Sequence, residues 1–169
     1  MDQELVERAR TLLDLCRTKG LTIAAAESCT GGLLAATLTE IAGSSDVFER
    51  GFVTYSNEAK QAMVGVTSAT LASHGSVSRE TAEAMASGAL AHAPVDLAVS
   101  ITVIAGPGGA VPGKPVGLVH FAAASRAGRL IARERNYGDI GRKQVRRASV
   151  IEALAMLHDL ATTEAASFG

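Results

Sequence analysis

The chain has 169 residues, of which 47% are apolar and 20% are charged, and its formal net charge is −1 at pH 7. This length and composition allow a buried core and exclude a disordered chain, so we expect one domain spanning residues 1–169. The near-neutral charge and the 4% of aromatic residues argue against a general nucleic-acid-binding surface and against a base-stacking platform.

The first half of the chain alternates patterns typical of helices and strands. Apolar residues recur at helical spacing before Gly20, which is a favourable residue to follow a helix. The apolar run that comes next has the length of a buried strand. The predicted elements are a helix over residues 3–18, a strand over 21–26, a helix over 30–42, a strand over 48–54 and a helix over 57–64, with turns over 43–46 and near 69–73.

The second half predicts one more helix, three strands and a long final helix. Ser78 is a favourable N-cap, and Asp139 is expected to open the final helix. The third strand is rich in Arg and Glu, as expected of an edge strand, and a hairpin should join it to the strand before. The predicted helices cover residues 78–91 and 139–161, and the strands cover 95–103, 116–124 and 128–137.

This order of elements predicts an α/β fold, a three-layer α/β/α sandwich with a mixed, mostly parallel sheet of about five strands. The early strands are joined by helices and should therefore be parallel, whereas the late hairpin adds antiparallel pairing. Ligands in such sheets bind beyond the carboxyl ends of the strands. Ser28, Tyr55 and Thr102 each lie near such an end and should line one rim.

The stretch AAESCTGG at residues 25–32 joins the first predicted strand to the next helix. A strand that turns here into a helix leaves backbone N–H groups unpaired at the helix N-terminus, where they can hold an anion. It also presents the hydroxyl of Ser28 beside those donors, as in an acyl-transfer site. The alternative is an ordinary helix N-cap, for which Ser and Thr are favoured. The candidate oxyanion or substrate-binding residues are Cys29, Thr30, Gly31 and Gly32.

A serine nucleophile needs a base, because its hydroxyl is weakly nucleophilic at neutral pH. Lys60 is the best candidate, since burial and nearby positive charge can lower the pKa of a lysine. Tyr55 could relay the proton or orient Lys60, and Cys29 is a rival nucleophile. The histidines stand in no motif-like setting and form no metal-binding spacing, so we expect no metal site; they are His74, His92, His120 and His158.

Two further segments suggest anion binding. Gly106 and Gly108 belong to a loop whose backbone could approach a ligand closely, although a simple turn explains the glycines equally well. Arg142 and Arg146 are four residues apart in the final helix, share a face, and could clamp one phosphate. Cations at a helix start oppose the macrodipole, which makes sense if an anion lies nearby. The alternative is solvated surface charge or an intersubunit salt bridge.

The cellular setting follows from cysteine usage and from the N-terminus. Cys16 and Cys29 cannot form a disulfide framework of the secreted type, and Cys16 falls on the apolar stripe of the first helix. The acidic, amphipathic start is no signal peptide, and no apolar segment approaches a membrane span. We expect a soluble cytoplasmic protein with no cofactor and no membrane or nucleic-acid partner. The Ala-rich helices suggest self-association into a homo-oligomer.

Several blocks of this sequence, in their order and spacing, resemble the CinA C-terminal domain family over roughly residues 5–160. The resemblance implies the same three-layer architecture and the catalytic trio of Ser28, Tyr55 and Lys60. The family usually has Gly where this chain has Val103, so either the backbone there is ordinary β or the following loop is altered. The blocks lie at residues 25–32, 51–60, 100–109, 114–117 and 138–146.

Because the family includes stand-alone nicotinamide-nucleotide amidases, the leading hypothesis is an amidohydrolase. It would deamidate nicotinamide mononucleotide through an acyl-enzyme, with Thr102 and the 106–109 loop shaping the pocket. A second hypothesis is a non-catalytic module that binds a nucleotide or a phosphorylated partner in a competence or DNA-damage context. A third is hydrolysis of a different small amide by the same machinery.

Overall fold

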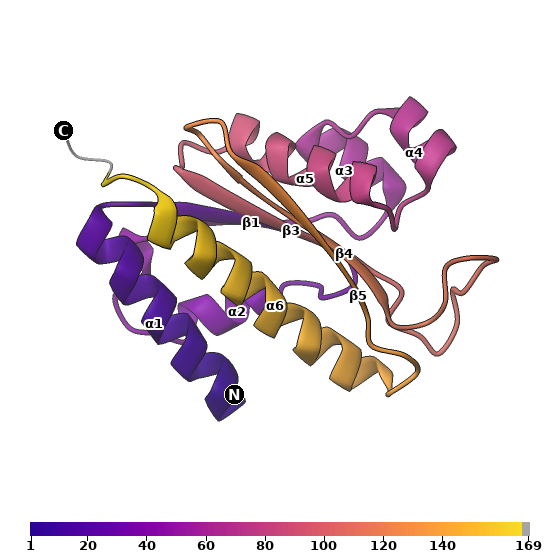
Figure 1. Ribbon diagram of the computed structural model, residues 1–169, viewed down its shortest axis with the longest axis horizontal. Helices are drawn as coiled ribbons and strands as arrows, with labels where there is room; N and C mark the ends of the chain where they lie inside the picture. The colour runs from indigo at the N-terminus through magenta and orange to yellow at the C-terminus, as the bar shows by residue number, and fades with distance from the viewer. Residues whose placement is uncertain (167–169) are drawn as a thin grey trace.

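Five strands form one sheet, in the order β2-β1-β3-β4-β5, in the computed structural model, which describes residues 1–166 (Figure 1). Strand β1 pairs in parallel with both β2 and β3, whereas β4 is antiparallel to both β3 and β5. Only β4 therefore runs against the others in this sheet, and the predicted mixed, mostly parallel sheet is confirmed. The strands are β1 (Ile23–Glu27), β2 (Phe48–Val53), β3 (Leu97–Val103), β4 (Leu118–Ser125) and β5 (Leu130–Asn136).

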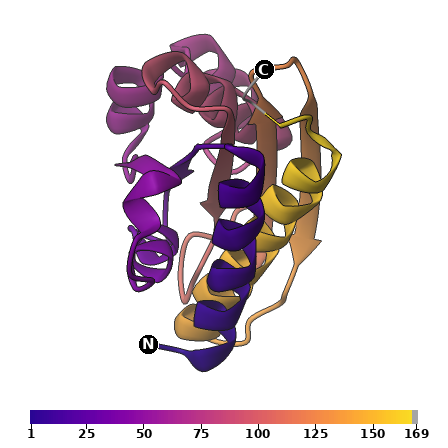
Figure 2. The same ribbon diagram turned by 90° about the vertical axis from the view of Figure 1, so that its left-hand side faces the viewer.

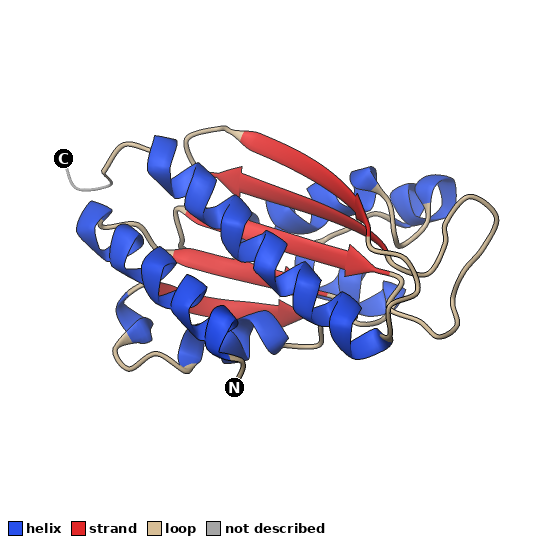
Figure 3. Ribbon diagram, turned by 60° about the horizontal axis from the view of Figure 1, so that its bottom comes forward, coloured by secondary structure: helices blue, strands red, loops and turns tan. Residues whose placement is uncertain are grey.

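Helices cover both faces of the sheet, which confirms the three-layer architecture. Helices α1, α2 and α6 lie on one face and α3, α4 and α5 on the other (Figure 1). Helices α1 and α6 lie side by side (Figure 2) and cross the sheet together (Figure 3). The helices are α1 (Gln3–Lys19), α2 (Leu33–Thr39), α3 (Asn57–Val64), α4 (Ser68–His74), α5 (Arg79–His92) and α6 (Arg142–Thr163), with a 3₁₀ turn, η1 (Ser44–Asp46).

The two faces of the sheet carry different cores because side chains alternate along each strand. The face toward α1, α2 and α6 holds the larger core, which includes Ile101 and Phe121 from the strands and Leu12 and Leu157 from the helices. The face toward α5 is lined by alanines such as Ala122, whose small side chains let that helix pack close to the sheet. Cys16 is fully buried, as predicted.

Two predicted helix starts are wrong because glycines precede these helices, one predicted turn is a helix, and several strand ends differ from the prediction by one or two residues. Helix α2 begins at Leu33 rather than at residue 30, because Gly31 and Gly32 have φ of 57° and 98°, outside the helical region. Helix α6 begins after Gly141, whose φ is 96°, so Asp139 does not cap it. The turn predicted near residues 69–73 is the helix α4.

The parallel strands β1, β2 and β3 end on the same side of the molecule. The start of α6 and the long loop between β3 and β4 lie at that same end, where the loop projects beyond the sheet (Figure 1). Strand β5 is an edge strand joined to β4 by a hairpin, as predicted. The fold therefore gathers segments from four parts of the chain at the carboxyl ends of the strands.

Candidate active site

Ser28 stands one residue beyond the end of β1, between the ends of β2 and β3. Its backbone N–H donates to the carbonyl of Ile101 over 3.0 Å, and the N–H of Thr54 donates to the carbonyl of Glu27 over 2.8 Å. These bonds carry the pairing of the parallel strands past β1. Ser28 is only 4% exposed, and its backbone is tied to the sheet.

Lys60 reaches Ser28 from helix α3, which begins after the N-cap Ser56. The Lys60 Nζ lies 3.1 Å from Ser28 Oγ, 2.9 Å from the carbonyl of Thr54 and 3.4 Å from the carbonyl of Tyr55. The residue is 1% exposed, and no carboxylate among residues 1–166 pairs with it. An ammonium ion in this setting has lost its water and gained no counter-charge.

The electrostatic consequence is a change in the proton affinity of the amine. Burial lowers the pKa of Lys60 from its ordinary value, and the neighbouring Cys29 offsets part of this change. Nearby positive charge was expected to contribute as well, but among the described residues burial is the cause of the lowered pKa. A neutral amine in contact with a serine hydroxyl can act as a general base.

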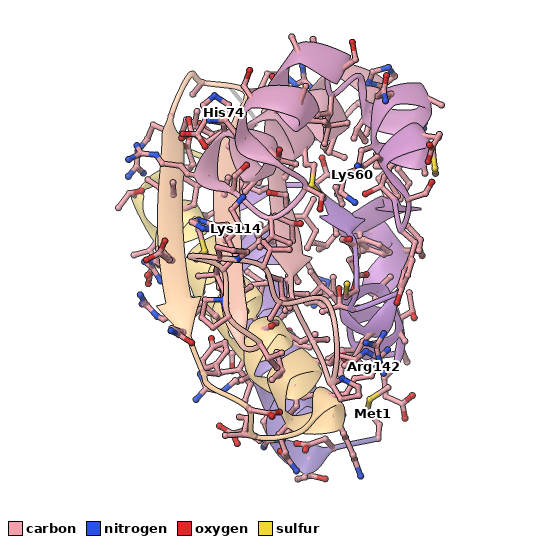
Figure 4. The ribbon with its side chains drawn as sticks, turned by 90° about the vertical axis from the view of Figure 1, so that its right-hand side faces the viewer. Met1, Lys60, His74, Lys114 and Arg142 are labelled. Carbon is pink, nitrogen blue, oxygen red and sulfur yellow. The ribbon has the colours of Figure 1, made fainter. Side chains whose placement is uncertain are left out.

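Tyr55 and Arg142 are joined by a hydrogen bond at the same end of the sheet. The Arg142 Nη2 donates to Tyr55 Oη over 2.8 Å, and its Nη1 donates to the carbonyl of Gly106 over 2.9 Å. Figure 4 faces the end of the sheet where these segments meet and shows Lys60 and Arg142 on the same side of the molecule. The phenol of Tyr55 thus contacts Arg142, whereas it is the backbone carbonyl of Tyr55 that contacts Lys60.

Arg146 lies one helical turn after Arg142 and has different partners. Its Nε donates to the carbonyl of Cys29 over 3.1 Å and its Nη2 to the carbonyl of Thr30 over 3.0 Å. The expected clamp, in which both arginines hold one phosphate, is not the arrangement in this structure, because each guanidinium is engaged by a different segment of the protein. Arg147 is also engaged, in ion pairs with Asp2 and Glu4.

Glu27, for which the sequence predicted no role, caps helix α2. Its carboxylate is 1% exposed and accepts from the N–H of Leu34 over 2.9 Å and of Ala35 over 3.0 Å. The expectation of unpaired amides at this helix end is therefore wrong for these two groups, which already hold an anion belonging to the protein. The available signal was a glutamate at the end of a strand, six residues before the first residue of the helix.

The loop between Ser28 and α2 retains amides that face no protein acceptor. The N–H of Gly31 donates to the carbonyl of Ser28 over 2.9 Å, which removes it as a donor to a ligand. Within residues 1–166, the N–H groups of Cys29, Thr30 and Gly32 have no hydrogen-bond acceptor. These amides of the loop, rather than those of the helix, are the remaining candidates for oxyanion donors.

Thr102 is close to Ser28 in the sheet but is already engaged. Its side chain is fully buried, and Oγ1 donates to the carbonyl of Ser76 over 2.6 Å. Its hydroxyl hydrogen is therefore used to hold the segment before α5 against β3. Val103, the next residue, pairs with Val119 as an ordinary strand residue. Of the two alternatives for Val103, an ordinary β backbone or an altered loop, the structure has the first.

The two glycines proposed for the 106–109 loop differ in their surroundings. Gly106 has φ of 81°, and a Cβ built there would lie 2.6 Å from Val116 Cγ1, so the position has no room for a side chain. Gly108 is exposed, and a Cβ there would meet nothing within 4 Å. Only Gly106 is thus tied to the site, through its carbonyl bond with Arg142.

In residues 1–166 the cysteine and histidine side chains form no hydrogen bond with the side chain of Ser28 or Lys60. Cys29 is half-buried and packs against the larger core, and burial raises the pKa of Cys16 to about 12. His74 pairs with Glu80 and His120 with Glu134. In the part of the chain that the structure describes, no three His, Cys, Asp or Glu side chains are grouped to hold a metal ion. None of its helices has the length and apolar character needed to cross a membrane.

Comparison with known proteins gives consistent relatives. The model of the CinA C-terminal domain matches residues 6–161. The nicotinamide-nucleotide amidohydrolase PncC of Escherichia coli (strain K12) is 50% identical over 157 residues, which cover 92% of this chain and 94% of that protein. A CinA-like protein of Chloroherpeton thalassium is 56% identical over 114 residues, which cover 68% of this chain and 27% of that longer protein.

The crystal structure of the competence/damage inducible protein CihA from Agrobacterium tumefaciens has the same fold. Its TM-score is 0.93 at 51% sequence identity, and the match covers 95% of this chain and 97% of that one. A CinA superfamily protein from Klebsiella pneumoniae matches with a TM-score of 0.91 at 33% identity, over 96% of this chain and all of the other. In both of these comparisons the structural similarity extends over nearly the whole length of this chain and of the other chain.

Proposed function

This chain belongs to the CinA C-terminal domain family, and from that premise we propose that it is an amidohydrolase that converts nicotinamide mononucleotide to nicotinic acid mononucleotide and ammonia. The name of the Escherichia coli relative supports this activity and this class of substrate. The single observation in the structure that carries the proposal is the contact between the buried Lys60 Nζ and Ser28 Oγ, at 3.1 Å. That contact supplies a nucleophile and a base in one place.

The first chemical step uses this pair. Neutral Lys60 accepts the Ser28 hydroxyl proton while Ser28 Oγ attacks the carboxamide carbon, giving a tetrahedral intermediate with a negatively charged oxygen. Burial favours the neutral amine because it lowers the pKa of Lys60. The free loop amides of Cys29, Thr30 and Gly32 are assigned to the oxyanion.

The second half of the reaction returns the enzyme to its starting state. Protonated Lys60 gives its proton to the departing amide nitrogen, the C–N bond breaks, and ammonia departs. The acyl group then remains bound to Ser28 Oγ as an ester. Water then attacks the ester carbon while Lys60 accepts its proton. The C–O bond to Ser28 breaks, and that proton passes to Ser28 Oγ as the carboxylic acid product leaves. No cofactor or metal enters this scheme.

Substrate binding is assigned to the hydrogen-bonded pair of Tyr55 and Arg142. Because Arg142 donates to the phenol oxygen, the phenol hydrogen of Tyr55 is free to be donated to the substrate. Arg142 and Lys143 are exposed, and the first turn of α6 contains no acidic residue, so positive charge is not neutralised locally. This supports the binding of a phosphate-bearing substrate beside Arg142.

The test is ammonia release from nicotinamide mononucleotide by the wild type, Ser28→Ala and Ser87→Ala. Ser87 is an exposed serine of α5 and serves as the matched control. We expect release by the wild type and Ser87→Ala, and a loss of roughly three to six powers of ten in Ser28→Ala. Full activity in a folded Ser28→Ala would exclude Ser28 as the nucleophile.

Two substrate comparisons separate the other hypotheses. Hydrolysis of free nicotinamide as fast as of the nucleotide would point to a different small amide as the substrate. Nucleotide binding by the wild type without ammonia release would point to the non-catalytic binding module.

Self-association and cytoplasmic localisation stay predictions. Light scattering on the purified protein would measure its self-association.

A further inference from the structure

We propose that Arg146 is a positioning residue that aims the backbone amide of Thr30 into the active site. The proposal rests on the proposed function, because it assigns that amide to the oxyanion of the amide-hydrolysis reaction. Arg146 stands in α6, 116 residues from Thr30 in the sequence. It would act through the loop, without touching the substrate.

Both contacts of Arg146 are with backbone carbonyls of the nucleophile loop, defined here as residues 28–32. The Nε and Nη2 atoms donate to two consecutive carbonyls, those of Cys29 and Thr30, over 3.1 Å and 3.0 Å. No acidic side chain in the described part of the chain pairs with this guanidinium. Its neighbour Arg147, in contrast, forms ion pairs with Asp2 and Glu4.

Peptide planarity converts this contact into an orientation. The carbonyl of Cys29 and the N–H of Thr30 belong to the same planar trans peptide unit and point in opposite directions. Holding the carbonyl toward α6 therefore turns the N–H of Thr30 away from α6. That N–H has no acceptor among residues 1–166, whereas the next amide, of Gly31, is used within the loop.

Backbone bonds bracket this peptide, from the N–H of Gly31 to the carbonyl of Ser28 and from the N–H of Leu33 to the carbonyl of Thr30, but the side chains of the loop do not hold it. The hydroxyl of Thr30 is fully buried and has no hydrogen-bond partner in residues 1–166, so its side chain does not hold the conformation. Gly31 has φ of 57° and is exposed, and glycine is the residue that restricts the backbone least. Arg146 adds a restraint from outside the loop, because it binds the carbonyl of the Cys29–Thr30 peptide directly.

Helix α6 is a rigid base for that restraint. Val145, Ser149 and Val150 flank Arg146 on the same helix and are fully buried, so the helix is fixed against the core. A guanidinium presents several donors in one plane and can hold two carbonyls together, whereas a lysine ammonium on a flexible stem is a poor substitute. The Arg-to-Lys change should therefore lose most of the orientation.

The experiment compares Arg146→Met and Arg146→Lys with the control Arg147→Met, using nicotinamide mononucleotide as the substrate. An oxyanion donor acts in the transition state, so its misorientation lowers kcat and leaves KM nearly unchanged. We expect kcat to fall about 10²- to 10³-fold in Arg146→Met, with KM within about threefold of the wild type and an unshifted pH profile. Arg147→Met should keep wild-type kcat even if it unfolds at a lower temperature.

A second readout does not depend on amide turnover. An alkyl fluorophosphonate phosphonylates an activated serine through an oxyanion-stabilised step, and intact-mass measurement gives its rate at Ser28, with Ser28→Ala as the blank. We expect slower labelling in both Arg146 variants and no change in Arg147→Met. Added guanidinium at millimolar concentration should partly restore kcat and labelling in Arg146→Ala.

The two proposals fail in different ways. Wild type that labels at Ser28 in an Arg146-dependent manner but releases no ammonia would reject the proposed substrate and support the positioning role. Wild-type turnover together with folded Arg146 variants whose kcat and labelling are unchanged would reject the positioning role alone. An effect confined to KM would also reject it, because that result would place Arg146 in substrate binding. A wild type that neither labels nor turns over would count against both.

Discussion

The Lys60 Nζ lies 3.1 Å from Ser28 Oγ, and its other two hydrogen-bond partners are backbone carbonyls. When a buried lysine is bound only by neutral oxygens, the desolvation of its ammonium is not offset by the attraction of a carboxylate. The protein therefore favours the neutral amine at a place where a serine hydroxyl is available. The pair is a local arrangement with consequences for both activity and stability.

The pH profile of activity should follow the proton on Lys60. Its pKa in the folded protein is lowered from 10.5, and only the neutral amine can take the serine proton, so kcat/KM should rise through a midpoint below 10.5. Lys60→Arg keeps a charge that cannot be lost, and we expect activity to fall roughly 10²- to 10⁴-fold with no such rise. A wild-type profile that is flat from pH 6 to 10 would contradict the assignment.

The same shift predicts a pH dependence of stability. Between the folded pKa of Lys60 and 10.5, the unfolded chain binds more protons than the folded one, so this lysine makes stability rise with pH. Replacement by Met removes that slope. The difference in unfolding free energy between Lys60→Met and the wild type should shift in favour of the variant as pH falls through this window, and stay constant below it. Urea denaturation at a series of pH values measures it.

Tyr55 and Arg142 should be energetically coupled. Because the two side chains share a hydrogen bond of 2.8 Å, removing either side chain should remove the contribution of the pair to substrate binding. We expect Tyr55→Phe and Arg142→Met to lower kcat/KM by amounts that do not add in the double variant, with a coupling of about 1–3 kcal/mol. Additive effects would mean that the two residues act independently on the substrate.

Glu27 should matter for stability although it does not contact Lys60. Its buried carboxylate accepts from two amides of α2, and Glu27→Gln replaces one acceptor oxygen by a donor that faces an N–H. We expect a loss of about 1–3 kcal/mol in unfolding free energy. The control is Glu40→Gln at the exposed end of the same helix, which should change little. Equal stability of the two variants would argue against the cap.

Gly106 and Gly108 provide a matched pair for the loop. An alanine at 106 needs an unfavourable φ of 81° and brings Cβ within 2.6 Å of Val116, whereas an alanine at 108 meets nothing within 4 Å. We expect Gly106→Ala to cost about 1–3 kcal/mol of stability and to lower activity through Arg142, and Gly108→Ala to do neither. Thermal unfolding and ammonia release would be compared, with Val116→Ala as the variant that relieves the contact.

Much of the fold was predictable because it depends on local patterns. Apolar residues at helical spacing predicted the helix over residues 3–18, and short continuous apolar runs predicted the buried strands. Helices and strands differ in the spacing at which side chains return to the same face. The order of these elements then restricts the sheet to a few topologies. The exact helix starts were less predictable, because at Gly32 and Gly141 the backbone conformation, not a polar side chain, sets the boundary.

The sequence alone also pointed to Ser28 and Lys60, because a strand–loop–helix junction and a suitable base can be recognised from residue types and resemblance. Only the tertiary structure decided which groups those side chains and their neighbours contact. Arg142 and Arg146 look equivalent in the sequence, yet one binds Tyr55 and the other the carbonyls of the nucleophile loop. The reason is physical: a backbone carbonyl leaves no mark in the sequence, and the direction of a side chain depends on elements that folding brings together.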